Sequence, residues 1–182
     1  MSIKTLRAAF ALGSLIIALL GGCATPAAPA DPITELLNLI EQRLAIGAEV
    51  ARSKWNSGAA IEDLKREREI VDAIGAQAAS HGLEPTLAKQ FFQAQIEASK
   101  MIQNARLAQW RATQQPAFSD APDLLRDIRP QLDRLTPAIL DALAKALPAL
   151  HAPATRARLN NYADNAARRA AMTPLLEVAP QN

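Results

Sequence analysis

Two basic residues interrupt an apolar row between Ile33 and Trp55, and their placement suggests a site for anions. The row keeps the three- and four-residue spacing of one helix face, and it consists of Leu36, Ile40, Arg43, Gly47, Val50 and Lys54. Arg43 and Lys54 are 11 residues apart, close to three full helical turns, so both point to the same side. Burying a cation without a partner costs free energy. The alternative interpretation is that both side chains reach past the core to solvent.

Charged residues also fall on the inward row of the next segment. Asp63 and Glu67 share that row with Ile70 and Ile74, and Arg66 lies beside them. The surrounding run EDLKRERE is dense in charge, so a solvated surface of salt bridges explains it equally well. Only the combination with the first segment favours a pocket.

A third segment places two uncharged polar residues among apolar ones. Ser99 and Gln103 are four residues apart on the face of Phe92 and Ile96, and polar groups on such a face need partners. A hydrogen bond to a neighbouring helix is one explanation, and a ligand is the other.

The three segments together predict a cationic pocket with hydrogen-bond donors. Arginine forks match carboxylates, and lysine supplies a mobile point charge. The sequence offers no paired Ser and His and no metal-ligand spacing, so we predict neither metal nor cofactor. Such a site would act on a small dianion by orientation and electrostatics rather than through a nucleophile.

Five helical segments can position these residues, which predicts an all-α, single domain of about five to six helices. They cover approximately residues 33–55, 60–80, 85–114, 123–147 and 155–176. The sequence NSG at 56–58, Gly82 and Pro85 mark helix ends. Pro130 and Pro137 predict a kink or a break in the fourth segment, because proline removes a donor and clashes with the preceding turn.

Composition and charge exclude some partners. Ala and Leu are abundant and aromatic residues make up 4% of the chain, which favours helices over strands. The net charge is +2, and without Lys4 and Arg7 it falls to zero. We therefore expect no general attraction to nucleic acid or to an anionic membrane.

The first residues form an export signal. Lys4 and Arg7 precede the apolar stretch 8–20, which is too short to span a bilayer. The following LGGC resembles a bacterial lipobox, so Cys23 is predicted to be lipidated and the protein to be anchored in the periplasm. Ala24 after the cysteine favours the outer membrane, and an ordinary secretory signal with an incidental cysteine is the alternative. The predicted divisions are 1–23 (lipoprotein signal peptide), 24–32 (Ala/Pro-rich tether) and 33–182 (helical domain).

The order of these motifs resembles the all-helical, AroQ-type chorismate mutases. The matching pieces are Arg43, Lys54 in AEVARSKW, IEDLKRE at 61–67, HGLEP at 81–85 and FFQAQIEASKMIQ at 91–103. The resemblance is close from 36 to about 109 and looser from 121 to 140. The signal sequence, ASKMIQ and the C-terminal helices are similar to the exported gamma subclass. The resemblance implies a chorismate mutase type II-like bundle that converts chorismate to prephenate, and a homodimer in which each chain has a complete site.

The resemblance also implies residue roles. The groups that would grip the substrate carboxylates are Arg43, Arg66 and Arg129, with Arg126 as the substitute for Arg129 and with Ser99 as a further hydrogen-bonding partner. Lys54 and Gln103 would donate to the ether oxygen, and Lys54 would also contact a carboxylate. Glu67 would accept from the ring hydroxyl, and Asp63 would support the site. Some exported relatives carry a C-terminal disulfide, which a chain with one cysteine cannot form.

Two other functions compete with catalysis. A catalytically inactive periplasmic module that binds a small dicarboxylate would keep the arginines but would need neither Lys54 nor Gln103. A purely structural helical lipoprotein would not bring cations onto apolar rows. The sequence favours the enzyme over both.

Overall fold

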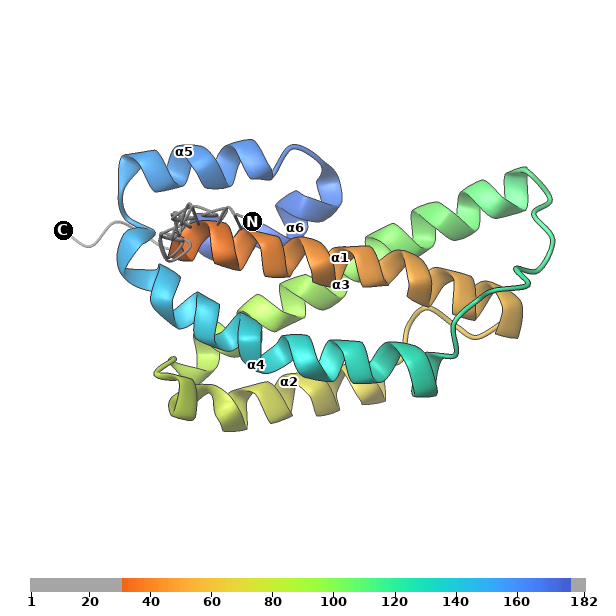
Figure 1. The fold of residues 1–182 in the computed structure, drawn as a ribbon, viewed down its shortest axis with the longest axis horizontal. Helices are drawn as coiled ribbons and strands as arrows, with labels where there is room; N and C mark the ends of the chain where they lie inside the picture. Colours follow the sequence, from red (N-terminus) through yellow and green to blue (C-terminus); the bar gives the residue numbers. More distant parts are fainter. Residues whose placement is uncertain (1–30, 178–182) are drawn as a thin grey trace, which may run out of the picture.

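The computed structural model describes residues 31–177, and this part of the chain is helical, with no strands. The two longest helices, α1 (Pro32–Ser57) and α3 (Pro85–Ala112), run from left to right in Figure 1. Helix α2 is Leu64–Ala78, α4 is Arg129–Ala146, α5 is Pro153–Tyr162 and α6 is Ala166–Glu177. Six α-helices confirm the predicted all-α bundle.

Local signals fix the ends of the long helices. The Asp31 carboxylate caps α1 by accepting from the Thr34 N–H at 3.0 Å, and Gly58 ends the helix with a φ of 68°. Glu84 caps α3 in the same way, with Pro85 as the first helical residue. These ends agree with those expected from the sequence, since carboxylate caps, N-terminal proline and C-terminal glycine each satisfy or relieve unpaired backbone groups.

The second helix begins later than the sequence suggested. Residues 59–63 are not helical, so the expectation that the helix begins near Ala60 is wrong. Asp63 caps α2 by accepting from the Arg66 N–H at 3.0 Å, and the Glu67 carboxylate accepts from the Asp63 N–H at 3.3 Å. This reciprocal capping stops the helix from extending backwards. A short 3-10 turn, η1 (Ala79–His81), ends the segment at Gly82.

The prolines do not break the fourth helix. Pro137 lies inside α4, which remains continuous, and both Pro137 and Asp133 are exposed. Solvent can therefore bond the Asp133 carbonyl that the proline leaves without a donor. The irregular piece precedes Pro130: residues 124–128 form the π-helical turn η2 (Leu124–Ile128). Arg129 keeps right-handed helical angles (φ −55°, ψ −44°) although proline follows it.

The fifth predicted segment is two helices rather than one. The chain turns at residues 163–165, and the Asn165 side chain caps α6 by accepting from the Arg168 N–H at 2.9 Å.

Helix α3 lies at the centre and contacts α1, α2 and α6, while α4 packs on α1. Phe91, Phe92, Leu140 and Leu143 are among the fully buried core residues. None of the helices within residues 31–177 combines the length and apolar character needed to span a membrane.

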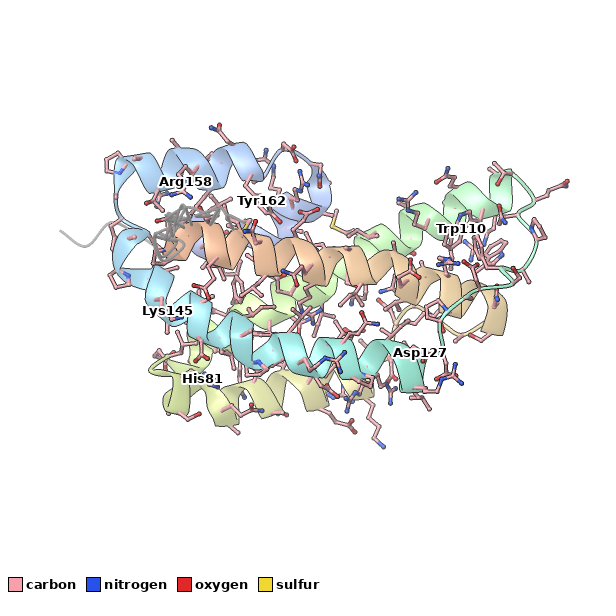
Figure 2. The ribbon with its side chains drawn as sticks, in the orientation of Figure 1. His81, Trp110, Asp127, Lys145, Arg158 and Tyr162 are labelled. Atoms are coloured by element: carbon pink, nitrogen blue, oxygen red, sulfur yellow. The ribbon has the colours of Figure 1, made fainter. Side chains whose placement is uncertain are left out.

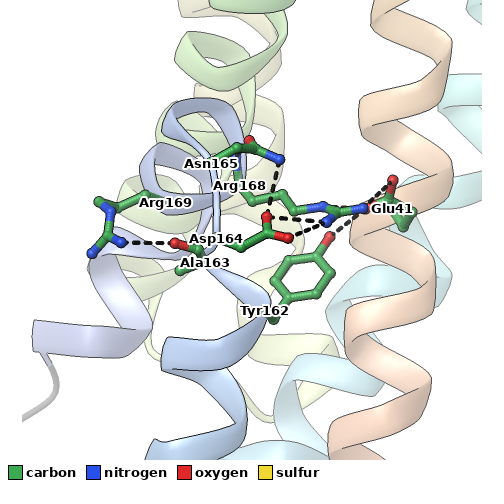
Figure 3. A network of polar contacts seen from close by, with 7 residues as sticks. All are labelled: Glu41, Tyr162, Ala163, Asp164, Asn165, Arg168 and Arg169. Carbon is green, nitrogen blue, oxygen red and sulfur yellow. Dashed lines mark hydrogen bonds and ion pairs between the residues drawn. The ribbon is translucent and has the colours of Figure 1, made fainter.

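Four residues join the C-terminal helices to α1, and we call them the C-terminal clasp: Glu41, Tyr162, Asp164 and Arg168 (Figure 3). The Arg168 guanidinium donates two bonds of 3.0 Å to the Glu41 carboxylate and two of 3.1 Å to that of Asp164. The Tyr162 hydroxyl donates to Glu41 at 2.9 Å. The Arg168 hydrogen bonds, followed in size by that of Tyr162, lower the pKa of Glu41 against the effect of burial.

Candidate active site

A cavity of about 250 Å³ lies among α1, α2, α3 and α4. Its walls include all eight predicted substrate-binding residues, namely Arg43, Lys54, Asp63, Arg66, Glu67, Ser99, Gln103 and Arg129. Arg126, the substitute for Arg129, is absent from these walls; its side chain is 79% exposed and pairs with Asp127 at 2.9 Å. The structure thus brings the predicted residues together around one space and separates the two arginine candidates.

Arg43 is a buried cation whose charge the described residues do not neutralise. It is 7% exposed, and among residues 31–177 it forms no ion pair. Its guanidinium carbon lies 5.9 Å from the centroid of the Phe92 ring. Burial lowers the pKa of Arg43 to about 10, so the group is still charged at neutral pH. A buried charge without a counter-charge is costly, and a ligand carboxylate would supply the missing partner.

Lys54 is held by a backbone oxygen rather than by a carboxylate. Its ammonium donates to the Ile61 carbonyl at 2.7 Å, in the segment between α1 and α2. Burial is the largest effect on the pKa of Lys54 and lowers it, while the charges of Asp63 and Glu67 act in the opposite direction. An ammonium has three donors, so Lys54 can keep this bond and still donate to a ligand.

Gln103 and Ser99 form a hydrogen-bonded pair with capacity to spare. The Gln103 amide nitrogen donates to the Ser99 hydroxyl oxygen at 3.1 Å. The Gln103 amide oxygen is buried and has no hydrogen-bond partner within the described residues. Rotating the amide by half a turn would exchange its oxygen and nitrogen, so Gln103 can offer a ligand either an acceptor or a donor.

A glycine on α1 makes room for this pair. A Cβ atom added at Gly47 would come within 3.0 Å of the Ser99 hydroxyl oxygen. The absence of a side chain at Gly47 therefore lets α1 and α3 approach closely beside the cavity. Gly47 stands between Arg43 and Val50 on the row that the sequence singled out, where it read only as part of the apolar face.

Asp63, Glu67 and the two remaining arginines occupy the ends of their helices. Asp63 is exposed and caps α2, so it has a structural task that the predicted supporting role did not specify. Arg66 in the first turn of α2 makes one long contact of 3.5 Å with Glu69. Arg129 is the first residue of α4 and forms no ion pair within residues 31–177. Both arginines are partly exposed and hence free to adjust to a ligand.

The connection between α3 and η2 is fastened to the end of α1. The Asn56 side chain exchanges two hydrogen bonds with the Phe118 backbone, at 2.7 and 2.9 Å. Trp110 lies between Trp55 and Phe118, with ring centroids 5.8 and 4.9 Å away; Figure 2 shows Trp110 at this end of the molecule. Arg52 stacks over the Phe118 ring at 5.0 Å. These contacts fix where the chain returns to begin η2 and α4, and hence where Arg129 is placed.

Several lining residues were not identified from the sequence. Lys100 carries an ammonium into the cavity wall, and Asp133 and Thr136 extend the α4 side. Lys100 belongs to the quoted motif ASKMIQ but reads as an ordinary solvated lysine. Asp133 follows Arg129 by four residues, a spacing that places both on one helix face and could have indicated it. Within residues 31–177, no group of His, Cys, Asp and Glu side chains is arranged to hold a metal ion.

Comparison with known proteins identifies the family of this chain. The family model described as chorismate mutase type II matches residues 34–104. A secreted chorismate mutase from Mycolicibacterium smegmatis is 35% identical over 167 residues, which are 90% of this chain and 92% of that protein. One from Mycobacterium tuberculosis is 28% identical over 80% of this chain and 74% of that protein. The crystal structure of a chorismate mutase from Burkholderia thailandensis has a TM-score of 0.71 and 39% identity, covering 81% of this chain and 99% of that one.

The chain therefore belongs to the chorismate mutase type II family. It is an isomerase of the all-helical kind, and the secreted relatives agree with an exported protein. The family match spans α1 to α3 and includes seven of the eight predicted binding residues; Arg129 lies beyond it. The inactive binding module and the structural lipoprotein lose their support.

Proposed function

We propose that the cavity converts chorismate to prephenate with the residue roles predicted from the sequence. Arg43, Arg66 and Arg129 bind the two carboxylates, and Ser99 adds a hydrogen bond. Lys54 and Gln103 donate to the ether oxygen, and Glu67 accepts from the ring hydroxyl. The observation that carries the proposal is the buried charge of Arg43, which has no ion-pair partner in the described part of the chain and lies in a cavity shared with all the other predicted residues.

The reaction needs no covalent help from the protein. One carbon–oxygen bond breaks as one carbon–carbon bond forms within the same molecule. Arginines bound to both carboxylates would select the compact conformer in which the reacting ends meet, an orientation effect. Lys54 and Gln103 would stabilise the negative charge that develops on the ether oxygen.

Two neighbouring arginines provide a matched test of these roles. Arg129→Gln should reduce kcat/KM for chorismate at least about tenfold, the loss expected for a charge-assisted bond to a carboxylate. Arg126→Gln should leave kcat/KM nearly unchanged, because Arg126 is exposed and lies outside the cavity wall. Chorismate loss measured with both purified variants separates the two, and the reverse ranking would assign the role to Arg126.

We propose further that the protein is a lipoprotein tethered to the outer membrane and facing the periplasm. Cys23 lies outside the described residues, and the support is the lipobox-like LGGC. Acyl chains on Cys23 would anchor the protein stably, since each buried methylene adds ~0.8 kcal/mol. Cys23→Ser should release the protein or stall its processing. Cell fractionation with a lipid label checks this, and an unlabelled, wholly soluble wild type would contradict it.

The resemblance to the gamma subclass supports a homodimer with one complete site in each chain. All eight proposed binding residues belong to one chain's cavity. Mixed Lys54→Ala and Arg129→Ala subunits should therefore regain no activity. Light scattering gives the oligomeric state, and restored turnover in the mixture would instead mean that the sites are shared between chains.

A further inference from the structure

Lys100 joins the cavity to a carboxylate outside it. Its ammonium lies 3.1 Å from one Glu67 carboxylate oxygen and 2.9 Å from one of Glu97. The Lys100 and Glu67 side chains are only 13% and 12% exposed, whereas Glu97 is 49% exposed and is not part of the cavity wall. Burial acts to lower the pKa of Lys100, but the bonds to Glu97 and Glu67 outweigh it and leave the pKa raised.

The Glu67 carboxylate is consequently held at both oxygens. One oxygen accepts from the Asp63 N–H at 3.3 Å and the other from Lys100 at 3.1 Å. An ionised carboxylate offers about four acceptor positions, so the two that remain are available to a ligand. The holding groups come from the N-cap of α2 and from α3, so the carboxylate is restrained from two directions.

The Glu67 carboxylate shares the cavity with other cations that could pair with it. Lys54, Arg66 and Arg129 line the same space, and an ion pair between Glu67 and one of them would remove a partner of the substrate carboxylates. Lys100 supplies the counter-charge of Glu67, and its ammonium also contacts Glu97, which lies outside the cavity wall. It thereby leaves the substrate-facing cations uncommitted.

We propose that Lys100 is a positioning residue that fixes the Glu67 carboxylate as the acceptor for the substrate's ring hydroxyl. This rests on the proposed role of Glu67. A route through Lys54 has the wrong sign: the charge of Lys100 lowers the pKa of Lys54, so removing Lys100 would favour the charged, donating form of Lys54 and would not impair it.

A double-mutant cycle on the full-length protein tests the proposal, with kcat and KM for chorismate as the readout. Lys100→Met should reduce kcat/KM about tenfold, the loss expected for a charge-assisted hydrogen bond. Glu67→Leu, which removes the acceptor, should also lower kcat/KM, with the loss divided between kcat and KM as it is in Lys100→Met. In the Glu67→Leu background, Lys100→Met should change kcat/KM less than about twofold, because the acceptor of the Lys100 bond is already gone.

Two further variants separate positioning from general stability. Lys100→Arg keeps the charge and should stay within about threefold of wild type. Lys89 forms a comparable bond of 2.9 Å from α3 to Asp72 on α2, away from the cavity, so Lys89→Met should retain activity within about twofold. Circular dichroism verifies folding, and Lys100→Gln replaces Lys100→Met if the latter does not fold.

The outcomes distinguish the inference from the proposed function. Equal losses on Lys100→Met in the wild-type and Glu67→Leu backgrounds, with Glu67→Leu itself impaired, overturn the positioning role and leave that of Glu67 standing. Full activity in Lys100→Met also overturns it. Full activity in Glu67→Leu removes the proposed role of Glu67, and the inference with it.

Discussion

The cavity and the C-terminal clasp both place an arginine beside α1, but they treat its charge in opposite ways. Arg168 in the clasp faces two carboxylates and a tyrosine ring, with every contact at hydrogen-bonding or stacking distance. Arg43, two residues after Glu41, is more deeply buried; within residues 31–177 it contacts the Phe92 ring and forms no ion pair. This comparison indicates that the paired charge of Arg168 serves stability, whereas we expect the buried charge of Arg43 to serve a ligand.

The largest effect should come from removing an uncommitted cavity donor. Lys54→Ala should lower kcat by ~10²–10³, the usual cost of one donor to a developing oxyanion, with the helical circular dichroism spectrum intact. Lys145→Ala is the control, because Lys145 is exposed and has only a 3.7 Å contact with Glu35. Full activity in Lys54→Ala would refute the proposed mechanism.

The second-largest effect should come from replacing Gln103, the second proposed donor, with an acid that can ionise. Gln103→Glu should lose activity by ~10² at neutral pH, because an ionised carboxylate cannot donate to the ether oxygen. Activity should return as the pH falls and the new acid gains its proton, while wild type stays active near neutrality. Turnover of both proteins from acidic to mildly alkaline pH checks this. An unchanged profile would exclude Gln103 from the ether-oxygen role.

A smaller effect should arise where α1 and α3 approach each other. Gly47→Ala should lower kcat/KM several-fold, since the added methyl group would press on the Ser99 hydroxyl, while alanine in a helix interior adds up to ~1 kcal/mol of stability. Gly75→Ala is the control, because its new methyl group would meet only the flexible end of Lys89. Only Gly47→Ala should combine a lower kcat/KM with a higher unfolding temperature. If both variants keep or lose activity to the same extent, the close approach of α1 and α3 is not the cause of the effect.

The clasp should affect stability without affecting catalysis. Arg168→Ala should lower the free energy of unfolding by about 1 kcal/mol, since the partners are partly exposed and screened, and kcat should not change. Arg158→Ala, which breaks a surface pair with Asp31, should cost less. Denaturant unfolding and chorismate kinetics measure both quantities, and a loss of kcat in Arg168→Ala would show that the clasp shapes the cavity.

The clasp contribution should also depend on pH. The pKa of Glu41 is lowered from its ordinary value of 4.5 in the folded protein. Its contribution to stability is therefore complete above about pH 4.5 and disappears as the pH falls through the lowered folded-state pKa. The difference in free energy of unfolding between wild type and Arg168→Ala should therefore shrink as the pH falls below about 4.5. Unfolding measured at a series of acidic pH values checks this, and a difference that does not change with pH would contradict the prediction.

Sequence periodicity predicted the inner faces better than the ends of the elements. Arg43, Lys54 and Gln103 were assigned to the interior by spacing alone, because helix geometry repeats regardless of what packs around it. The start of α2 was misplaced, because the reciprocal caps of Asp63 and Glu67 also read as charges on an inward row. The separation of α5 from α6 was missed, although Asn165 is a typical N-cap residue.

Tertiary packing supplied what the sequence could not. Lys100 looks like any surface lysine until α2 brings Glu67 against it. Gly47 looks like a gap in an apolar row until α3 places Ser99 opposite. The resemblance favoured Arg129 over Arg126 but could not show where either side chain lies, since the π-helical turn that orients them depends on how the preceding connection is fastened to α1.

The length of α1 matters for using this protein as an immobilised catalyst. Lys54 follows Asp31, the N-cap of α1, by 23 residues, so Lys54 lies about 35 Å along the helix from that cap. A linker attached ahead of Asp31 would hold the molecule by the end remote from Lys54 (Figure 1). Beads or electrodes coupled in this way would leave the cavity turned toward the surrounding solution, where chorismate can enter.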